Sequence, residues 1–290
     1  MKKLIAVITI LAAVSGSASA YFKGDVTKIT GPDGYSGIKL DAVIGSDTFA
    51  IEPILETYTS DGATYDGKTL RTYSLRGSMD AEKYTVAALA GITPEVNNYS
   101  NRFVGGDITF TLTPGGGGHS RLAGPGSRAG SGGGKGVSRV DVGVGGKYTM
   151  HTQAQTVGAD KETGQGEGSI FAGAKVLMVN ISGSYTGYSY GDQDAVTFGL
   201  VPGHTFATNT LPKSSVNVKL DLPGQPLVTP FVSYTATKYK AYAGQAVSDS
   251  TALLLGAYID FDMVKANVGY QVFDQDGKDS YISLGVGISF

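Results

Sequence analysis

Four absences narrow the class of protein to which this 290-residue chain belongs. It has no cysteine, no tryptophan, only three histidines, and beyond residue 20 no apolar segment of the roughly 20 residues that a transmembrane helix needs. Without cysteine there is no disulfide framework and no attachment site for the lipid of a lipoprotein. Lys and Arg number 23 against 25 Asp and Glu, so the chain lacks the basic stripe of a nucleic-acid-binding protein. We therefore expect no nucleic acid partner.

The scarcity of histidine also limits catalysis. His119 lies in a glycine-rich stretch, His204 lies beside a Pro-Gly turn, and His151 lies at the end of an alternating segment. General acid–base catalysis needs a partner group within hydrogen-bond reach, and none is evident at a characteristic spacing. No two histidines, or histidine and aspartate, share a face at metal-ligand spacing. We expect no enzymatic activity, no metal and no cofactor.

The amino-terminal residues have the pattern of a secretory signal peptide. Lys2 and Lys3 are followed by a mainly apolar stretch, 4–14, and by small residues, 15–20, that end in Ala18-Ser19-Ala20. This pattern predicts export with cleavage after Ala20, within an Ala18-x-Ala20 motif. An uncleaved anchor is the alternative, which the short apolar stretch disfavours. The mature chain, 21–290, is then predicted to form a single domain, with 21 Lys and Arg against 25 Asp and Glu once the two lysines are removed.

The last ten residues alternate strictly between apolar and smaller or more polar side chains. A period of two places alternate side chains on one face of a strand. The apolar set is Ile282, Leu284, Val286, Ile288 and Phe290, and the opposite set is Tyr281, Ser283, Gly285, Gly287 and Ser289.

This ending resembles the final strand of Gram-negative bacterial outer-membrane β-barrels. The resemblance implies residence in the cell outer membrane, with outer-membrane lipid around the barrel. It also implies that the apolar set and Phe290 are read by the barrel-assembly machinery, with periplasmic chaperones as further partners during biogenesis. Homo-oligomerisation is left open.

Similar alternation recurs along the chain, which predicts an all-β protein. The clearest segments are 38–44, 84–92, 107–112, 139–150, 179–185, 216–222, 253–262 and 264–272. A soluble β-sandwich is the alternative, but its strands average about five or six residues. Several of these segments are closer to the roughly 9 to 11 residues that cross a bilayer obliquely. We therefore predict a closed antiparallel transmembrane β-barrel.

The strand number is predicted to be 14. About thirteen strands are evident, and a first strand at 21–30 gives the even count usual for bacterial barrels. A hairpin of 196–201 and 204–208 would raise the number to 16. If 48–79 does not hold separate strands, the number falls to 12.

The connections alternate in length, which fixes an orientation. Links at 262–263 and 223–226 are tight, whereas 243–250 and 151–167 are longer, as expected of periplasmic turns and outer loops respectively. By the same alternation the segment 114–136, with eleven glycines and three cations, lies on the periplasmic side. One interpretation is a basic loop that folds into the lumen or contacts a partner. The other, which the composition favours, is a disordered linker.

If the apolar faces contact lipid, the charged residues of the strands face the lumen. Charge facing lipid at mid-depth would cost up to about 2–4 kcal/mol per residue. The pore-lining candidates are the cations Lys39, Arg76, Arg139, Lys147, Lys175, Lys219 and Lys265 and the acids Asp41, Glu52, Glu56, Asp107, Asp141, Asp221, Asp260 and Asp262.

Six of these charges form three Lys-x-Asp or Arg-x-Asp motifs, at 39–41, 139–141 and 219–221. Such pairs either bind polar solutes or form ion pairs that hold neighbouring strands in register, and both interpretations remain open.

These features predict a porin-like channel for passive diffusion of small hydrophilic solutes. About eight strands are filled by their own side chains, whereas 14 leave space. Selectivity is expected to be weak, because seven cations against eight acids form no ring of one sign. The alternative is a structural or surface-interaction barrel, adhesin-like and without transport, whose outer loops bind a partner.

Overall fold

The structure, a computed structural model, describes residues 21–46, 48–61, 68–81, 83–112, 122–125, 139–191, 211–222, 227–241 and 246–290. The expected signal peptide and the expected hairpin at 196–208 lie outside these residues. Among the described residues, no helix is long and apolar enough to span a membrane.

Fourteen antiparallel strands close into one barrel, in which β1 pairs with β14 and every other pair is consecutive in the chain. The predicted fold and strand number are confirmed, and the residues around 48–79 do hold two strands. The strands are β1 (Tyr21–Thr30), β2 (Ser36–Gly45), β3 (Phe49–Thr59), β4 (Leu70–Asp80), β5 (Tyr84–Val96), β6 (Tyr99–Thr111), β7 (Arg139–Gln153), β8 (Lys161–Val176), β9 (Val179–Tyr190), β10 (Leu211–Asp221), β11 (Val228–Lys240), β12 (Ser250–Phe261), β13 (Val264–Asp274) and β14 (Lys278–Ser289).

The barrel closes at the seam between β1 and β14. Thr30 lies opposite Ile282, and the register continues to Lys23 opposite Ser289. Phe22 and Phe290 exchange backbone hydrogen bonds of 2.7 and 2.9 Å, and their rings lie 5.2 Å apart between centroids. Closure leaves no strand with a free edge, which a bilayer requires because it offers no water to satisfy backbone groups.

Alternation along the strands produces two chemically distinct surfaces. On β14, Leu284 and Val286 point outward and are 59% and 57% exposed, whereas Ser283 points inward and is 7% exposed. The same division holds on β6, where Val104 is exposed and Asp107 is buried. The outer surface is therefore an apolar band suited to lipid, and polar side chains point into the barrel.

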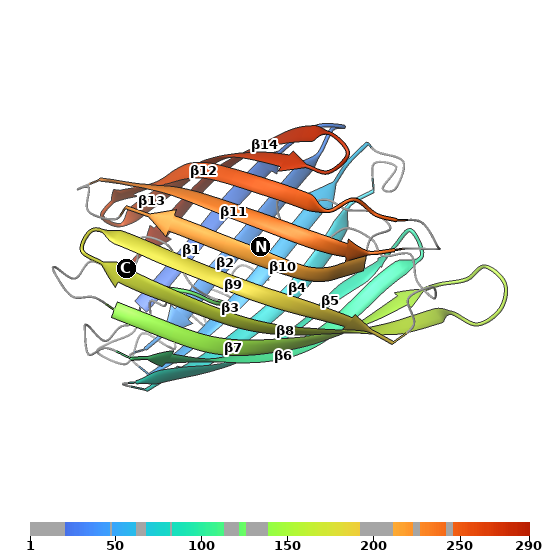
Figure 1. The fold of residues 1–290 in the computed structure, drawn as a ribbon, viewed down its shortest axis with the longest axis horizontal. Coiled ribbons are helices and arrows are strands. Elements are labelled where there is room, and N and C mark those ends of the chain that lie inside the picture. Colours follow the sequence, from blue (N-terminus) through green and yellow to red (C-terminus); the bar gives the residue numbers. More distant parts are fainter. Residues whose placement is uncertain are drawn as a thin grey trace, which may run out of the picture.

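The strands run obliquely to the long axis of the barrel (Figure 1), and the connections differ at its two ends. We call the end where β1 begins and β14 ends the near rim, and the opposite end the far rim. At the near rim, Asp262 and Met263 make a two-residue turn in which Asp262 has a positive φ of 69°. Aspartate tolerates this left-handed conformation better than most residues.

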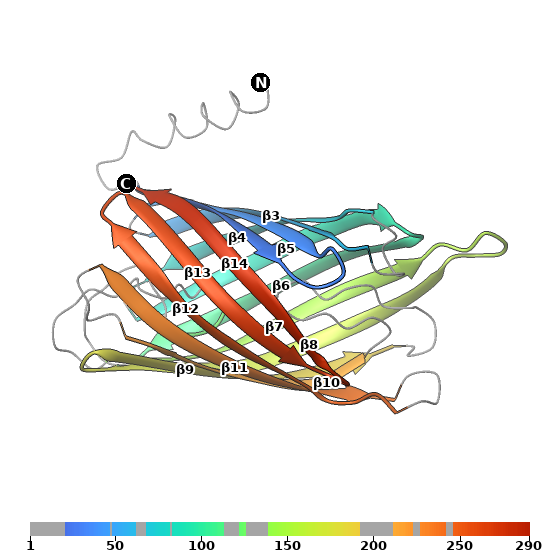
Figure 2. The same ribbon diagram turned by 90° about the horizontal axis from the view of Figure 1, so that it is seen from above.

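The far rim carries one long projection, the hairpin of β7 and β8 (Figure 2). The sequence predicted a long polar connection over 151–167, but β7 reaches Gln153 and β8 begins at Lys161. His151 pairs with Thr163 and Gln153 with Lys161, so most of the expected loop is strand. The polar composition was interpreted as a loop. A hairpin that extends beyond the membrane can expose both of its faces to water, so its strands need no apolar face.

An apolar cluster fills part of the interior at the far rim. Tyr35 is stacked on Tyr58, at 6.4 Å between ring centroids, and meets Tyr281 edge-on at 5.7 Å. Edge-on and offset stacked rings are the arrangements that aromatic pairs prefer. The members of the cluster are Ile29, Tyr35, Tyr58, Leu70, Ala252, Phe273 and Tyr281. The cluster lies inside the wall formed by β12–β14 and β1–β4, so this part of the mouth is closed to solvent.

Candidate functional site

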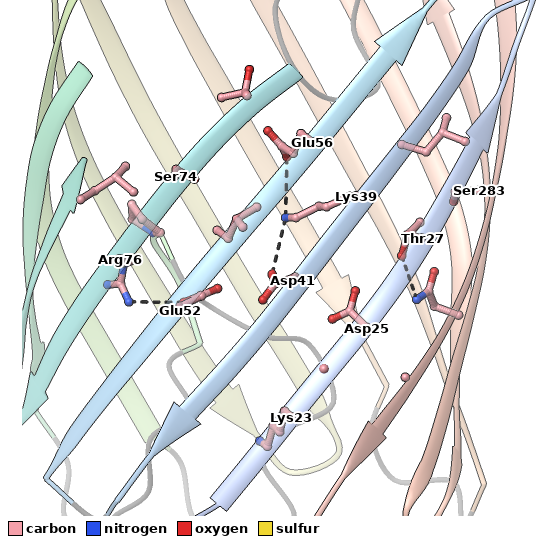
Figure 3. Close-up of a pocket in the computed structure, with 18 of the residues that line it drawn as sticks. Lys23, Asp25, Thr27, Lys39, Asp41, Glu52, Glu56, Ser74, Arg76 and Ser283 are labelled. Carbon is pink, nitrogen blue, oxygen red and sulfur yellow. Dashed lines mark hydrogen bonds and ion pairs between the residues drawn. The ribbon is translucent and has the colours of Figure 1, made fainter. Parts of the chain in front are cut away.

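The candidate site is the barrel interior, which holds a cavity of about 1000 Å³. Residues from all fourteen strands line it, together with Pro125 from the long connection between β6 and β7. Figure 3 shows part of the wall, where side chains of β1 to β4 such as Lys39, Asp41 and Glu52 point into the cavity.

Nine of the fifteen pore-lining candidates line this cavity. They are Lys39, Asp41, Glu52, Glu56, Arg76, Lys147, Lys219, Asp260 and Lys265. Their part in conduction stays a prediction.

The remaining candidates lie elsewhere. Arg139, Asp141 and Lys175 lie toward the near rim, where Asp141 is completely buried and Lys175 is 8% exposed. Asp107 is buried beside Arg76, and Asp221 is buried beside Lys219. Asp262 is not on the wall, because it belongs to the tight turn at the near rim. A residue at the end of an alternating segment can belong to the turn, where the period of two no longer determines its direction.

Lys23, Asp25 and Glu167 also line the cavity but were missed. Lys23 and Asp25 lie on β1. This strand was predicted from the sequence only because it makes the number of strands even. Glu167 was placed in a loop, although the polar residues Thr163, Gln165 and Glu167 alternate with glycine and could have indicated a strand.

The three charged motifs are ion pairs within single strands. The side chains approach to 3.7 Å in Lys39–Asp41, 3.0 Å in Arg139–Asp141 and 3.1 Å in Lys219–Asp221. Lys39 also lies 4.0 Å from Glu56 on β3 (Figure 3), so this pair extends across two strands. Paired charges lower the cost of facing a partly dry lumen.

Arg76 contacts two carboxylates in the lumen. Its Nη2 donates to both carboxylate oxygens of Asp107, at 3.2 and 3.0 Å, and its Nη1 lies 3.9 Å from Glu52. The Arg76 and Asp107 side chains are at most 8% exposed. The guanidinium thus joins β3, β4 and β6 across the inner wall and balances two carboxylates with one cation.

A chain of polar side chains crosses β6, β7 and β8. The Tyr99 hydroxyl lies 2.7 Å from His151 Nδ1, and His151 Nε2 lies 2.9 Å from Gln165 Oε1. Gln165 Nε2 donates to Glu167 Oε1 at 3.1 Å, and Lys147 Nζ lies 2.9 Å from that oxygen. Both ring nitrogens of His151 are occupied within the wall, which is the arrangement of a positioned structural histidine.

Aromatic rings lie near three of the lysines that line the cavity, the first being Lys23, whose Nζ lies 5.8 Å from the ring centre of Tyr21. Lys219 Nζ lies 5.2 Å from the ring centre of Phe231 and 5.3 Å from that of Tyr258, whose rings stack at 4.6 Å. Lys147 Nζ lies 5.5 Å from the ring of Phe103. Such cation–π contacts hold the ammonium groups against the wall. In the part of the chain that the structure describes, no three His, Asp or Glu side chains gather as metal ligands.

A closed antiparallel barrel with an apolar outer band and a charged, hollow interior defines an outer-membrane β-barrel, resident in the outer membrane of a Gram-negative bacterium.

No family model and no curated protein matches the chain. Among solved structures, OmpT of Vibrio cholerae, expressed in the outer membrane, aligns with a TM-score of 0.50 and 11% identity over 94% of this chain and 99% of that one. The CymD monoaromatic hydrocarbon channel aligns at 0.48, with 12% identity over 98% and 91%. CdiB from Acinetobacter baumannii aligns at 0.49, with 9% identity over 94% of this chain, which spans 60% of the length of CdiB. The likeness to OmpT is one of fold.

Proposed function

We propose that the protein is a channel through which small hydrophilic solutes diffuse passively across the outer membrane. The observation that carries this proposal is the cavity of about 1000 Å³ lined by charged and hydroxyl side chains. An eight-stranded barrel is filled by its own side chains, whereas the circumference of fourteen strands leaves interior space. Water entering that space would solvate the charges that face it.

Weak selectivity follows from the charges of the wall. Among the residues that the structure describes, six cations and six acids line the cavity: Lys23, Lys39, Arg76, Lys147, Lys219 and Lys265, with Asp25, Asp41, Glu52, Glu56, Glu167 and Asp260. Strong preference for one ion sign needs a ring of a single charge. Cations and acids are instead interleaved, as at Lys147 and Glu167, and they offset each other's fields locally.

Liposome swelling tests this proposal and measures its size limit. Purified protein is reconstituted into liposomes, which are diluted into isosmotic solutions of sugars of increasing size. We expect fast swelling with the smallest sugars and a steady decline with size, with similar rates for neutral solutes of equal size. Liposomes that contain folded, heat-modifiable protein yet swell no faster than empty liposomes contradict the proposal.

A surface-interaction role is the second candidate, and the β7–β8 hairpin favours it. These strands have 15 and 16 residues, longer than the bilayer requires, and Val157 in the connection between them is 90% exposed. Replacing residues 154–160 with a short turn separates the candidates. Loss of adhesion to cells with unchanged liposome swelling supports a binding role for the hairpin, and unchanged adhesion refutes it.

A further inference from the structure

A short stretch of the connection between β6 and β7 lies inside the barrel. This inner segment, residues 122–125, rests against the inner faces of β7 and β8, where Ala123 is 2% exposed and Pro125 reaches the cavity wall. The sequence left open whether the glycine-rich connection enters the lumen. For these four residues the structure places it there.

A buried carboxylate anchors the inner segment. The backbone N–H of Leu122 donates to Asp141 Oδ2 at 3.0 Å. The other oxygen, Oδ1, accepts from Thr111 Oγ1 at 2.9 Å and from Arg139 Nε at 3.0 Å. Asp141 has no exposed surface, and a buried carboxylate needs such donors on both oxygens. The Leu122 amide therefore completes the set of donors around Asp141.

The wall beneath the segment is shaped by glycines. A Cβ on Gly173 would lie 2.7 Å from Leu122 Cβ and 3.2 Å from Ala123 Cβ, so only glycine leaves room for the segment. The Phe171 ring lies against Gly143 on the wall and against Gly124 in the segment, where an added Cβ would come within 2.2 and 2.4 Å of the ring. Gly124 also has a φ of +86°, which favours glycine.

We infer that the inner segment is the size-limiting element of the channel. Asp141 and Phe171, which lie toward the near rim, hold it in place. This inference rests on the proposed function. The alternation of β7 turns Asp141 toward the lumen, yet its surface is withdrawn from solvent where the segment docks. Pro125, at the other end of the segment, borders the remaining cavity. The cavity is thus bordered on this side by the segment as well as by β7 and β8, and the segment takes up space that the strands alone would leave open.

Gly124→Val tests this inference without changing the barrel wall. A branched side chain at this φ is strained and collides with Phe171, so the segment must leave its docked position. Gly158→Val is the matched control: Gly158 also has a positive φ, of 98°, but lies in the β7–β8 connection with nothing within 4 Å of its added Cβ. We expect a larger single-channel conductance and a larger sugar cutoff for Gly124→Val only. Equal conductance in the two variants and the wild type overturns the inference.

A single cysteine provides the complementary test, because the chain has no native cysteine. Ala123 is 2% exposed within the docked segment, so we expect Ala123→Cys in folded protein to react slowly with a maleimide. Val157→Cys is the control and should react fast, because Val157 is 90% exposed. Equal labelling rates in the two variants contradict docking, whether or not the protein conducts.

Adding Gly124→Val to the Ala123→Cys variant links docking to conductance. We expect the added substitution to raise both the maleimide labelling rate and the single-channel conductance. Faster labelling with unchanged conductance overturns the size-limiting role. A silent wild-type barrel in which Ala123→Cys is shielded instead contradicts the proposed function and leaves the docked geometry intact.

Discussion

Arg76 illustrates how single residues hold the interior together. It is 6% exposed and contacts Asp107 and Glu52, which are also buried. Removing one partner of a buried ion pair leaves an uncompensated charge, which costs far more than the pair itself contributes. Exposed pairs have little such effect, since water solvates the remaining charge.

Arg76→Met is therefore expected to destabilise the barrel by about 3 kcal/mol. Lys39→Met is the control, because the Lys39 side chain is 40% exposed and its loss should cost less than about 1 kcal/mol. The measurement is the free energy of unfolding by urea in lipid vesicles. Equal losses in the two variants would show that the Arg76 cluster is hydrated and not buried.

For single residues, the sequence predicts the face of the strand on which a side chain lies better than it predicts which residue that side chain contacts. The alternation around Lys39 and Asp41 places both side chains in the lumen, and their spacing within one strand allows an ion pair. The contact between Arg76 and Asp107 could not be foreseen, because it crosses β5 and depends on the register of two hairpins. Ala87, opposite Asp107 on the intervening strand, is small, but the sequence alone does not identify it as that neighbour.

Among the strands, β1 offers the clearest test of the assignment of one face to lipid and the other face to the lumen. Val26 is 44% exposed near the middle of the strand and points outward, whereas its neighbour Thr27 lines the cavity. An arginine at mid-depth on the lipid side costs about 2–4 kcal/mol, and a lumen position tolerates it.

Val26→Arg should therefore lower the free energy of unfolding in vesicles by about 2–4 kcal/mol. Thr27→Arg should lower it much less, since water in the lumen can solvate the added charge. If Thr27→Arg is the more damaging variant, the lumen at this level is too dry or too tightly packed for a channel.

The terminal strand gives a second prediction at this scale. Ile288 is 48% exposed and belongs to the apolar, outward set of β14, whereas Ser289 belongs to the opposite set, which faces the lumen. We expect Ile288→Asp together with Phe290→Asp to block assembly, because the pair removes the apolar pattern that the resemblance assigns to recognition. Ser289→Asp adds charge to the same strand on its lumen face and should assemble normally. Heat-modifiable barrel in outer-membrane fractions is the readout, and normal yield of the double variant contradicts this interpretation.

Strand positions were predictable wherever one face is strongly apolar. The alternation of β12, β13 and β14 identified these strands nearly to their ends. The amino-terminal half of β8 was missed because its outward residues include Gly164, Gly166 and Gly168, which supply no apolar signal. Backbone hydrogen bonds to β7 form the strand there. Such bonds involve no side chains, so they produce no pattern in the sequence of β8.

For the molecule as a whole, the interleaved charges of the wall predict its ion preference. Replacing Lys39, Lys219 and Lys265 with glutamine should make the channel cation-selective. Replacing Asp25, Asp41 and Asp260, which also line the cavity, with asparagine should shift it toward anions by a similar amount. The zero-current potential in a salt gradient measures both shifts. No shift in either variant would mean that ions do not pass these side chains.

The closed barrel was predicted from the period-two alternation, and the number of strands from the even count usual for bacterial barrels. Both are properties of the whole sequence pattern. The position of the inner segment could not be predicted in this way. Its glycines indicated a lack of regular structure, but the docking surface combines Asp141 of β7 with Phe171 and Gly173 of β8. Only the pairing of β7 with β8 places these residues side by side beneath residues 122–125.

Single-channel recording in planar lipid bilayers tests the central claim most directly. Purified, folded protein should insert in uniform steps, each giving the same ohmic conductance, with a zero-current potential near zero in a salt gradient. Repeated insertions, verified by heat-modifiable protein in the same membranes, that carry no current would contradict the account of the lumen as a water-filled passage.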